Sequence, residues 1–139
     1  MGDLSPNFSR QEFACKCGCG VDAVDPILVM QLERMRASAG VPLSIRSGCR
    51  CQNHNREEGG TDDSAHLSIP PPVPSPAAGG GVGGGEPCQA VDLVAGAGAE
   101  RFRLLGAAYE AGFVRMGIGR DFLHVDVDPD KPQRVIWLY

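Results

Sequence analysis

The chain has 139 residues, of which 42% are hydrophobic and 22% are charged, and its formal net charge is −4 at pH 7. These values are typical of a globular protein, and the length predicts one domain spanning residues 1–139. The negative charge and the lack of a Lys/Arg run argue against nucleic-acid binding. The sequence also lacks the apolar stretch of about 18 residues that a membrane-spanning helix needs.

The N-terminal segment combines a helix signal with a group of cysteines. Ser9, followed three residues later by Glu12, matches a capping box and predicts a short helical turn. Residues 15–20 are Cys-Lys-Cys-Gly-Cys-Gly, which predicts a tight knuckle and no regular helix. This knuckle could hold a metal ion, or its cysteines could form disulfides or stay buried thiols, with Cys51 as the expected partner. The six cysteines of the chain leave their redox state open.

The clearest helix signal covers residues 25–39. Asp25 is an N-cap residue, Pro26 occupies the first helical position, and Gly40 follows the last turn as a stop. The spacing of the apolar residues predicts one buried stripe that includes two methionines: Ile27, Leu28, Met30, Leu32 and Met35.

The middle of the chain holds a strand, a short helix and an unusual insertion. Residues 41–48 are typical of a strand that runs into a turn, and residues 53–58 of a short helix ended by Gly59 and Gly60. Residues 68–87 contain six prolines and six glycines. Such a segment cannot bury enough surface to offset its ordering entropy, so we expect a flexible insertion looped out from the domain. The alternative is a PxxP ligand for an SH3-like partner.

The C-terminal half combines strands with one further helix. We expect strands at residues 88–94, 113–116, about 121–128 and 135–139, and a helix at residues 99–111. The apolar positions of this helix recur at steps of three and four residues: Phe102, Leu105, Ala108 and Tyr109.

The three histidines of the chain suggest a metal site. The available donors are His66, Asp92 and His124, with His54 in reserve. Two imidazoles and one carboxylate make a three-ligand zinc set with an open fourth position, which is the pattern of a catalytic site. A lone histidine in a strand is also common as a structural residue, so the residues alone leave both interpretations open.

A catalytic zinc site would need a nearby carboxylate as general base. Water in the open position has a pKa lowered toward about 7, and a base must take its proton. Asp121 lies three residues before His124, and Asp126 lies two residues after it. Asp126 shares the strand face of His124, whereas Asp121 could reach the same point only through a bend. Either carboxylate could serve.

The order of short motifs along the chain resembles the M15 zinc peptidases. These are D-Ala-D-Ala carboxypeptidases and related peptidoglycan endopeptidases, including phage lysins. The resemblance covers nearly the whole chain apart from the Pro/Gly segment, and the N-terminal segment resembles the compact branch of the family. The matching elements are Ser47-Gly48-Cys49-Arg50, His54-Asn55, Gly59-Gly60, Ser64-Ala65-His66, Gln89-Ala90-Val91-Asp92-Leu93, Gly117-Ile118-Gly119, His124-Val125-Asp126 and Trp137.

The resemblance implies a role for each of the main site residues. His66, Asp92 and His124 would bind one catalytic zinc ion. Asp121 matches the position of the general base, which would deprotonate the zinc-bound water and pass the proton to the leaving amine. Arg50 matches the arginine that holds a substrate carbonyl or carboxylate and stabilises the developing oxyanion.

Other residues are expected to support the site. By the same resemblance, Ser64 would help to orient the substrate, Trp137 would form part of the wall, and Asp126 would support the ligands. His54 lies outside the family's ligand set, and we expect it to be structural.

The resemblance also implies the fold and the activity. We expect an α+β fold of the hedgehog/DD-peptidase-like kind, with a small antiparallel sheet, two main flanking helices and a zinc cleft. The expected activity is zinc-dependent cleavage of peptidoglycan stem peptides by a monomer, as a D-Ala-D-Ala carboxypeptidase or an L-Ala-D-Glu-type endopeptidase. The N-terminus lacks the features of a signal peptide, so we expect cytoplasmic synthesis, from which the protein could be released to the cell wall.

Two rival interpretations remain. One is a non-catalytic zinc-binding module that recognises cell-wall peptide or a protein partner; the presence of Asp121 favours an enzyme over this module. The other is a structural or redox module in which the cysteine knuckle holds the metal.

The chain departs from the family pattern between its first two expected ligands. His66 and Asp92 are separated by 25 residues, whereas the family's motif His-x-x-Gly-x-Ala-x-Asp is much shorter. The excess coincides with the Pro/Gly segment, and such an insertion is tolerated if its ends stay close. Cys88 replaces the expected glycine, and Cys49 stands where an aromatic residue is common. This new pair could form a disulfide across the base of the insertion.

Overall fold

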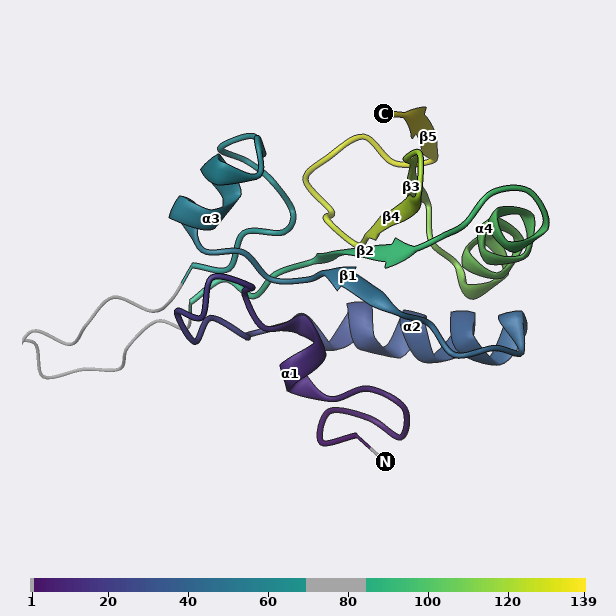
Figure 1. Ribbon diagram of the computed structural model, residues 1–139, viewed down its shortest axis with the longest axis horizontal. Coiled ribbons are helices and arrows are strands. Elements are labelled where there is room, and N and C mark those ends of the chain that lie inside the picture. Colours follow the sequence, from purple (N-terminus) through teal and green to yellow (C-terminus); the bar gives the residue numbers. More distant parts are fainter. Residues whose placement is uncertain (1, 70–84) are drawn as a thin grey trace, which may run out of the picture.

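The computed structural model describes residues 2–69 and 85–139, which form four helices and one five-stranded sheet (Figure 1). Within these residues no helix has the length and apolar character needed to cross a membrane. The helices are α1 (Arg10–Phe13), α2 (Pro26–Ala39), α3 (Gln52–Glu57) and α4 (Ala99–Ala111), and the strands are β1 (Ile45–Ser47), β2 (Ala90–Val94), β3 (Arg115–Ile118), β4 (Phe122–Asp126) and β5 (Val135–Leu138).

The strands lie in the order β1-β2-β4-β3-β5. The predicted antiparallel pairing is confirmed for the first four strands, but it is wrong for β5, which runs parallel to β3. The reason lies in the short connection at residues 127–134. Because β3 and β4 are antiparallel, the last residue of β4 lies beside the first residue of β3, and the connection starts there. It then passes to the side of β3 that faces away from β4. Since β5 therefore starts beside the start of β3, it must run in the same direction.

The two long helices pack against each other and, with the sheet, enclose the core. Figure 1 shows α2 on one side of β1 and β2 and the short helix α3 on the other. The predicted ends of α2 are confirmed, because Asp25 Oδ1 accepts a hydrogen bond from the Ile27 amide (2.8 Å) and Gly40 has a φ of 68°. The predicted ends of α4 are confirmed as well.

The predicted buried faces of α2 and α4 are partly wrong. Ile27 and Met30 are 53% and 46% exposed, and Phe102 and Tyr109 are 82% and 74% exposed. The face of α2 that packs inward is aliphatic, whereas the inward face of α4 is rich in alanine, whose small side chain lets two helices approach closely. The buried residues are Leu28, Val29, Leu32 and Met35 in α2 and Leu104, Ala107, Ala108 and Ala111 in α4.

The N-terminal turn folds as its sequence predicts. The Glu12 carboxylate accepts a hydrogen bond from the Ser9 amide (2.6 Å), which forms the capping box of α1. Phe8 and Phe13 are buried in the core on either side of this cap. The turn thereby anchors the start of the chain, and the cysteine knuckle follows it directly.

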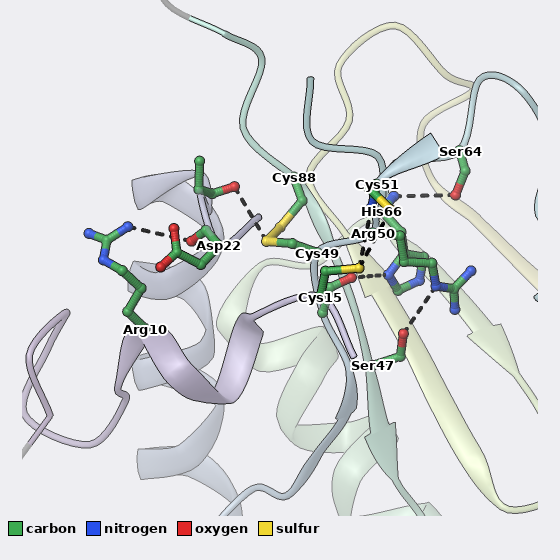
Figure 2. The surroundings of a disulfide bond; sticks show 12 residues. Arg10, Cys15, Asp22, Ser47, Cys49, Arg50, Cys51, Ser64, His66 and Cys88 are labelled. Carbon is green, nitrogen blue, oxygen red and sulfur yellow. Dashed lines mark hydrogen bonds between the residues drawn. A yellow bond between two sulfur atoms is a disulfide. The ribbon is translucent and has the colours of Figure 1, made fainter. Parts of the chain in front are cut away.

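The ends of the predicted insertion are held together, although residues 70–84, with the prolines of the PxxP hypothesis, lie outside the described residues. At the base, the Ile69 amide donates to the Glu86 carbonyl (2.9 Å). Cys49 and Cys88 form a disulfide, as predicted (Figure 2). The two segments that carry His66 and Asp92 are therefore fixed side by side despite the residues between them.

Candidate metal centre

Three segments bring His66, Asp92 and His124 together. Asp92 in β2 and His124 in β4 are direct partners in the antiparallel register, so their side chains share one face of the sheet. His66 comes from the loop after α3. Its carbonyl accepts a hydrogen bond from the Arg50 amide (2.8 Å), which fastens this loop beside the sheet.

The three side chains point one ligand atom each at a common centre. Asp92 Oδ1 lies 3.0 Å from His124 Nδ1 and 3.3 Å from His66 Nε2, and the two nitrogens are 3.2 Å apart. A tetrahedral zinc ion with bonds of about 2.0–2.2 Å would separate neighbouring ligand atoms by about 3.3 Å. All three residues are buried. The donor set and its spacing therefore fit zinc.

The tautomer of His66 is set by a backbone carbonyl. Its Nδ1 lies 2.7 Å from the Gly48 oxygen. A carbonyl oxygen only accepts hydrogen bonds, so Nδ1 carries the proton and donates. In the neutral ring, Nε2 then presents its lone pair to the common centre.

The tautomer of His124 is set by Asp126. His124 Nε2 donates to Asp126 Oδ2 (2.7 Å), and Arg115 Nε donates to Asp126 Oδ1 (2.7 Å). His124 Nδ1 therefore faces the centre without a proton when the ring is neutral. Two lone pairs and a carboxylate oxygen converge within hydrogen-bond distance, and a cation is the group that relieves their repulsion.

The ionisation of the site follows from burial and from these contacts. Burial acts to raise the pKa of Asp92, but its close contacts with the His124 and His66 rings, each of which can bind a proton, outweigh burial and lower the pKa. Burial lowers the pKa of His66, which favours the neutral ring. Burial also acts to lower the pKa of His124, but hydrogen bonds with Asp126 and Asp92 raise it. Of these two rings, His124 is thus the one that more readily binds a proton in the metal-free protein.

The other oxygen of Asp92 is held by Arg50. Arg50 Nη2 donates to Asp92 Oδ2 (3.1 Å), and its Nε donates to the Ser47 hydroxyl (3.1 Å). This contact leaves Oδ1 of Asp92 for the histidines. The Ser64 hydroxyl accepts a hydrogen bond from the His66 amide (3.3 Å), so it supports the loop that carries this ligand (Figure 2). Both Arg50 and Ser64 also line the cavity that the three candidate ligands face.

The three candidate ligands open into a cavity of about 670 Å³, a size typical of ligand-binding sites. Aromatic rings form one wall, and several cations also line the cavity. Trp137 lies 5.4 Å from His124 between ring centroids, and the Arg115 guanidinium lies 5.0 Å from the Trp137 ring centre. The aromatic and cationic lining residues include Lys16, Arg46, Phe122, Lys131, Trp137 and Tyr139.

Asp121 lies outside the cluster of three candidate ligands. It precedes β4, its side chain is 66% exposed, and it forms a salt bridge with Arg46. Arg46 and Phe122 line the cavity, whereas Asp121 is not among the lining residues in the described part of the chain. His54 lies near Glu57 and Glu58 in α3 and also lines the cavity, outside the three-residue cluster.

Sequence reasoning missed several residues of this site, among them Arg46, Arg115 and Tyr139. An arginine inside the apolar strand pattern of β3 was a usable signal, since a buried arginine needs an acidic partner. The position of Tyr139 depends on the parallel pairing of β5 with β3, which no local pattern indicates. Burial raises the pKa of the Tyr139 hydroxyl, in keeping with a place in the wall.

A family model described as Peptidase M15 matches residues 6–128, and this range includes the three candidate ligands and Asp121. No curated protein matches the chain.

Proposed function

Because the chain belongs to the peptidase M15 family, we propose that it is a zinc metallopeptidase that cleaves peptidoglycan stem peptides. The proposed fold is of the hedgehog/DD-peptidase-like kind, formed as a single domain across residues 1–139. The bond cleaved would be that of a D-Ala-D-Ala carboxypeptidase or an L-Ala-D-Glu-type endopeptidase. One chain supplies all three candidate ligands, which is consistent with a monomer.

The observation that carries the proposal is the convergence of three metal-ligating atoms in an open cavity. His66 Nε2, Asp92 Oδ1 and His124 Nδ1 lie 3.0–3.3 Å apart, and backbone and side-chain acceptors hold both imidazoles in the ligating tautomer. A zinc ion bound there would supply Lewis-acid activation of water and of the scissile carbonyl. The cavity gives a peptide access to this point.

Asp121 is the better candidate for the general base when it is compared with Asp126. Both oxygens of Asp126 are engaged, Oδ1 by Arg115 and the Asp128 amide and Oδ2 by His124. Asp126 therefore supports His124 and cannot also take a proton from water without breaking these bonds. The Asp121 carboxylate is exposed and pairs with Arg46.

We therefore assign the proton transfer to the Asp121 carboxylate. It would accept a proton from the attacking water and deliver it to the leaving amine. Since Arg46 holds one oxygen of Asp121 and lines the cavity, a rotation of this exposed pair would bring the carboxylate toward the substrate. A substrate carboxylate would then replace Asp121 as the salt-bridge partner of Arg46.

The charges around the cavity fit an acidic peptide. Lys16, Arg46 and Lys131 line it, together with Arg50, whose guanidinium already contacts Asp92. Peptidoglycan stem peptides carry free carboxylates on D-Ala and D-Glu, which such cations bind. We propose that Arg50 stabilises the developing oxyanion as well as holding Asp92. Ser64 would orient the substrate, and Trp137 would pack against it.

The test is hydrolysis of two peptides by zinc-loaded protein, one ending in D-Ala-D-Ala and one containing L-Ala-γ-D-Glu, followed by mass spectrometry. We expect cleavage of one peptide, its loss with chelator, and its return when zinc is added. The His66→Ala variant should be inactive under all three conditions: zinc-loaded, with chelator, and after zinc is added back. Binding of either peptide without cleavage, in protein that holds zinc at this site, would favour the non-catalytic module and contradict the proposal.

A further inference from the structure

We propose that the protein binds a second zinc ion, structural in role, through the thiolates of Cys15, Cys17, Cys19 and Cys51. This site is separate from the cluster of His66, Asp92 and His124. The inference does not depend on the activity proposed above. It rests on the positions of four sulfur atoms and on the backbone that holds them.

The sulfur atoms have the spacing of a tetrahedral metal site. The Sγ atom of Cys15 lies 3.4 Å from that of Cys17 and 3.9 Å from that of Cys51, and Cys17 and Cys51 are 3.7 Å apart. Cys19 completes the group, with all four ligand atoms within 4.8 Å of one another. Zinc–sulfur bonds of about 2.3 Å in a tetrahedron would separate neighbouring sulfurs by about 3.8 Å. The three measured separations lie around this value.

The backbone of the knuckle is folded so that Cys15, Cys17 and Cys19, which occupy every second position, bring their sulfur atoms together. Gly18 and Gly20 have φ values of 81° and 86°, a conformation that glycine adopts without the cost other residues incur. The Cys15 amide donates to the Val21 carbonyl (2.7 Å), and this bond closes the loop around residues 15–20. The backbone conformation therefore accounts for glycine at positions 18 and 20.

Backbone amides also point at the sulfur atoms. The Cys51 amide donates to Cys15 Sγ (3.5 Å), and the His54 amide donates to Cys51 Sγ (3.4 Å) at the start of α3. Amide donors of this kind stabilise the negative charge of metal-bound thiolates and orient the ligands. Figure 2 shows the Cys15 and Cys51 side chains close together beside the disulfide.

The contrast with Cys49 and Cys88 supports metal binding over oxidation. These two cysteines form a buried disulfide, whereas the other four are free thiols in close contact. Conditions that oxidise the buried pair would also oxidise these four thiols, whose sulfur atoms lie within 4.8 Å of one another, unless something protects them. Metal coordination gives that protection, so that one molecule can hold both a disulfide and four reduced cysteines.

The site has a clear structural consequence. It would join the N-terminal knuckle to the first turn of α3, directly after Arg50. The Arg50 backbone in turn bonds to the His66 carbonyl (2.8 Å) and to the Ser68 amide (3.0 Å). A closed site with four thiolates has no open position for substrate, so its role would be to hold these segments in place.

The first test is the number of zinc ions per chain, measured by elemental analysis of the full-length protein purified without chelator. We expect two ions in the wild type, one in His66→Ala and one in Cys17→Ser. If the catalytic proposal alone failed, the wild type and His66→Ala would both hold one ion and Cys17→Ser none. Loss of all zinc from His66→Ala, with Cys17→Ser retaining it, would overturn the thiolate site.

A second measurement covers the case in which Cys17→Ser does not fold. Cobalt bound to wild type and to His66→Ala should give strong sulfur-to-cobalt charge-transfer absorption in both proteins. Alkylation without reductant should modify four cysteines only after chelator and denaturant are added, and never Cys49 or Cys88. Disulfides among Cys15, Cys17, Cys19 and Cys51 in freshly purified protein, or no charge-transfer band, would contradict the proposal.

Discussion

Asp126 lies two residues after His124 in β4 and accepts the hydrogen bond from His124 Nε2 at 2.7 Å. Residues two apart in a strand share one face, so the same strand supplies both the candidate ligand and the group that orients it. Arg115 in β3 holds the other oxygen of Asp126. The His124 ring is therefore fixed by a buried chain of polar contacts that leaves only Nδ1 directed at the metal centre.

The first prediction concerns the hydrogen bond by which Asp126 orients His124. Asp126→Asn removes the negative charge that stabilises the His124 Nε2 proton and leaves Arg115 without its ionic partner. We expect the zinc affinity of the His66 site to fall by about 10- to 100-fold, measured by competition with a chromophoric chelator. The control is Glu110→Gln, since Glu110 is exposed on α4, outside the residues that line the cavity. Equal affinities in the two variants would refute this role of Asp126.

The second prediction separates metal binding from proton transfer. Asp121→Asn should retain zinc, because Asp121 is not part of the three-residue cluster. It should lower kcat by about 10²- to 10⁴-fold, since an amide cannot accept the proton from water. The loss of rate would be measured by single-turnover hydrolysis of whichever test peptide the wild type cleaves. The assignment of Asp121 as base would be wrong if the variant kept more than about half of the wild-type rate.

A partner variant tests the salt bridge that holds Asp121. Arg46→Gln frees the Asp121 carboxylate and removes a cation from the cavity. Because Arg46 is proposed to exchange Asp121 for a substrate carboxylate, we expect KM to rise with a smaller effect on kcat. Steady-state kinetics with a peptide and its carboxamide would measure this. The wild type should prefer the free carboxylate, and Arg46→Gln should lose that preference; an unchanged preference would contradict the exchange.

The pH dependence of zinc binding follows from His124. Its contacts with Asp126 and Asp92 outweigh burial and raise its pKa, so the metal-free protein binds a proton there at a higher pH than ordinary histidine. Zinc must displace that proton below this pKa, and affinity should therefore rise with pH until the ring is neutral. Calorimetry in two buffers of different ionisation enthalpy, at about pH 6 and about pH 8, counts the released protons.

Asp126→Asn provides the control for this experiment. Without the Asp126 carboxylate the pKa of His124 should fall, and proton release should move to lower pH. A binding heat that is the same in both buffers at about pH 6 would show that no proton is displaced.

The wall of the cavity depends on Gly117. A Cβ atom at this position would lie 2.6 Å from the Trp137 ring and 2.6 Å from the Tyr139 ring. Gly117→Ala should displace both rings, shift the fluorescence of the single tryptophan, and lower kcat/KM by about 10- to 100-fold. Gly106→Ala is the matched control, because a Cβ there meets nothing within 4 Å. It should leave activity unchanged and stabilise α4 by roughly 0.5–1 kcal/mol.

The helix ends could be predicted from the sequence because their signals are local. Asp25 and Gly40 set the limits of α2 through contacts within a few residues. The buried faces were harder, since Phe102 and Tyr109 dominate the apolar pattern of α4 while its alanines make the contact with the core. The direction of β5 was also beyond local signals, because it depends on the path of the connection around β3.

The candidate site was predictable in part. The residue types of His66, Asp92 and His124 indicated a metal, but only the family resemblance selected them, because 25 residues separate the first two. The disulfide between Cys49 and Cys88 was inferred from their replacement of family residues at the base of the insertion, and the structure confirms it. The contact of Arg50 with Asp92 was not foreseen, since it depends on how β1 and β2 pair.

The most direct test of the metal centre is anomalous diffraction at the zinc absorption edge from crystals of the zinc-loaded protein. We predict a peak about 2.0–2.2 Å from His66 Nε2, Asp92 Oδ1 and His124 Nδ1. Crystals of His66→Ala should lack this peak under the same conditions. Zinc-loaded wild-type crystals with no anomalous peak among these three atoms would contradict the account.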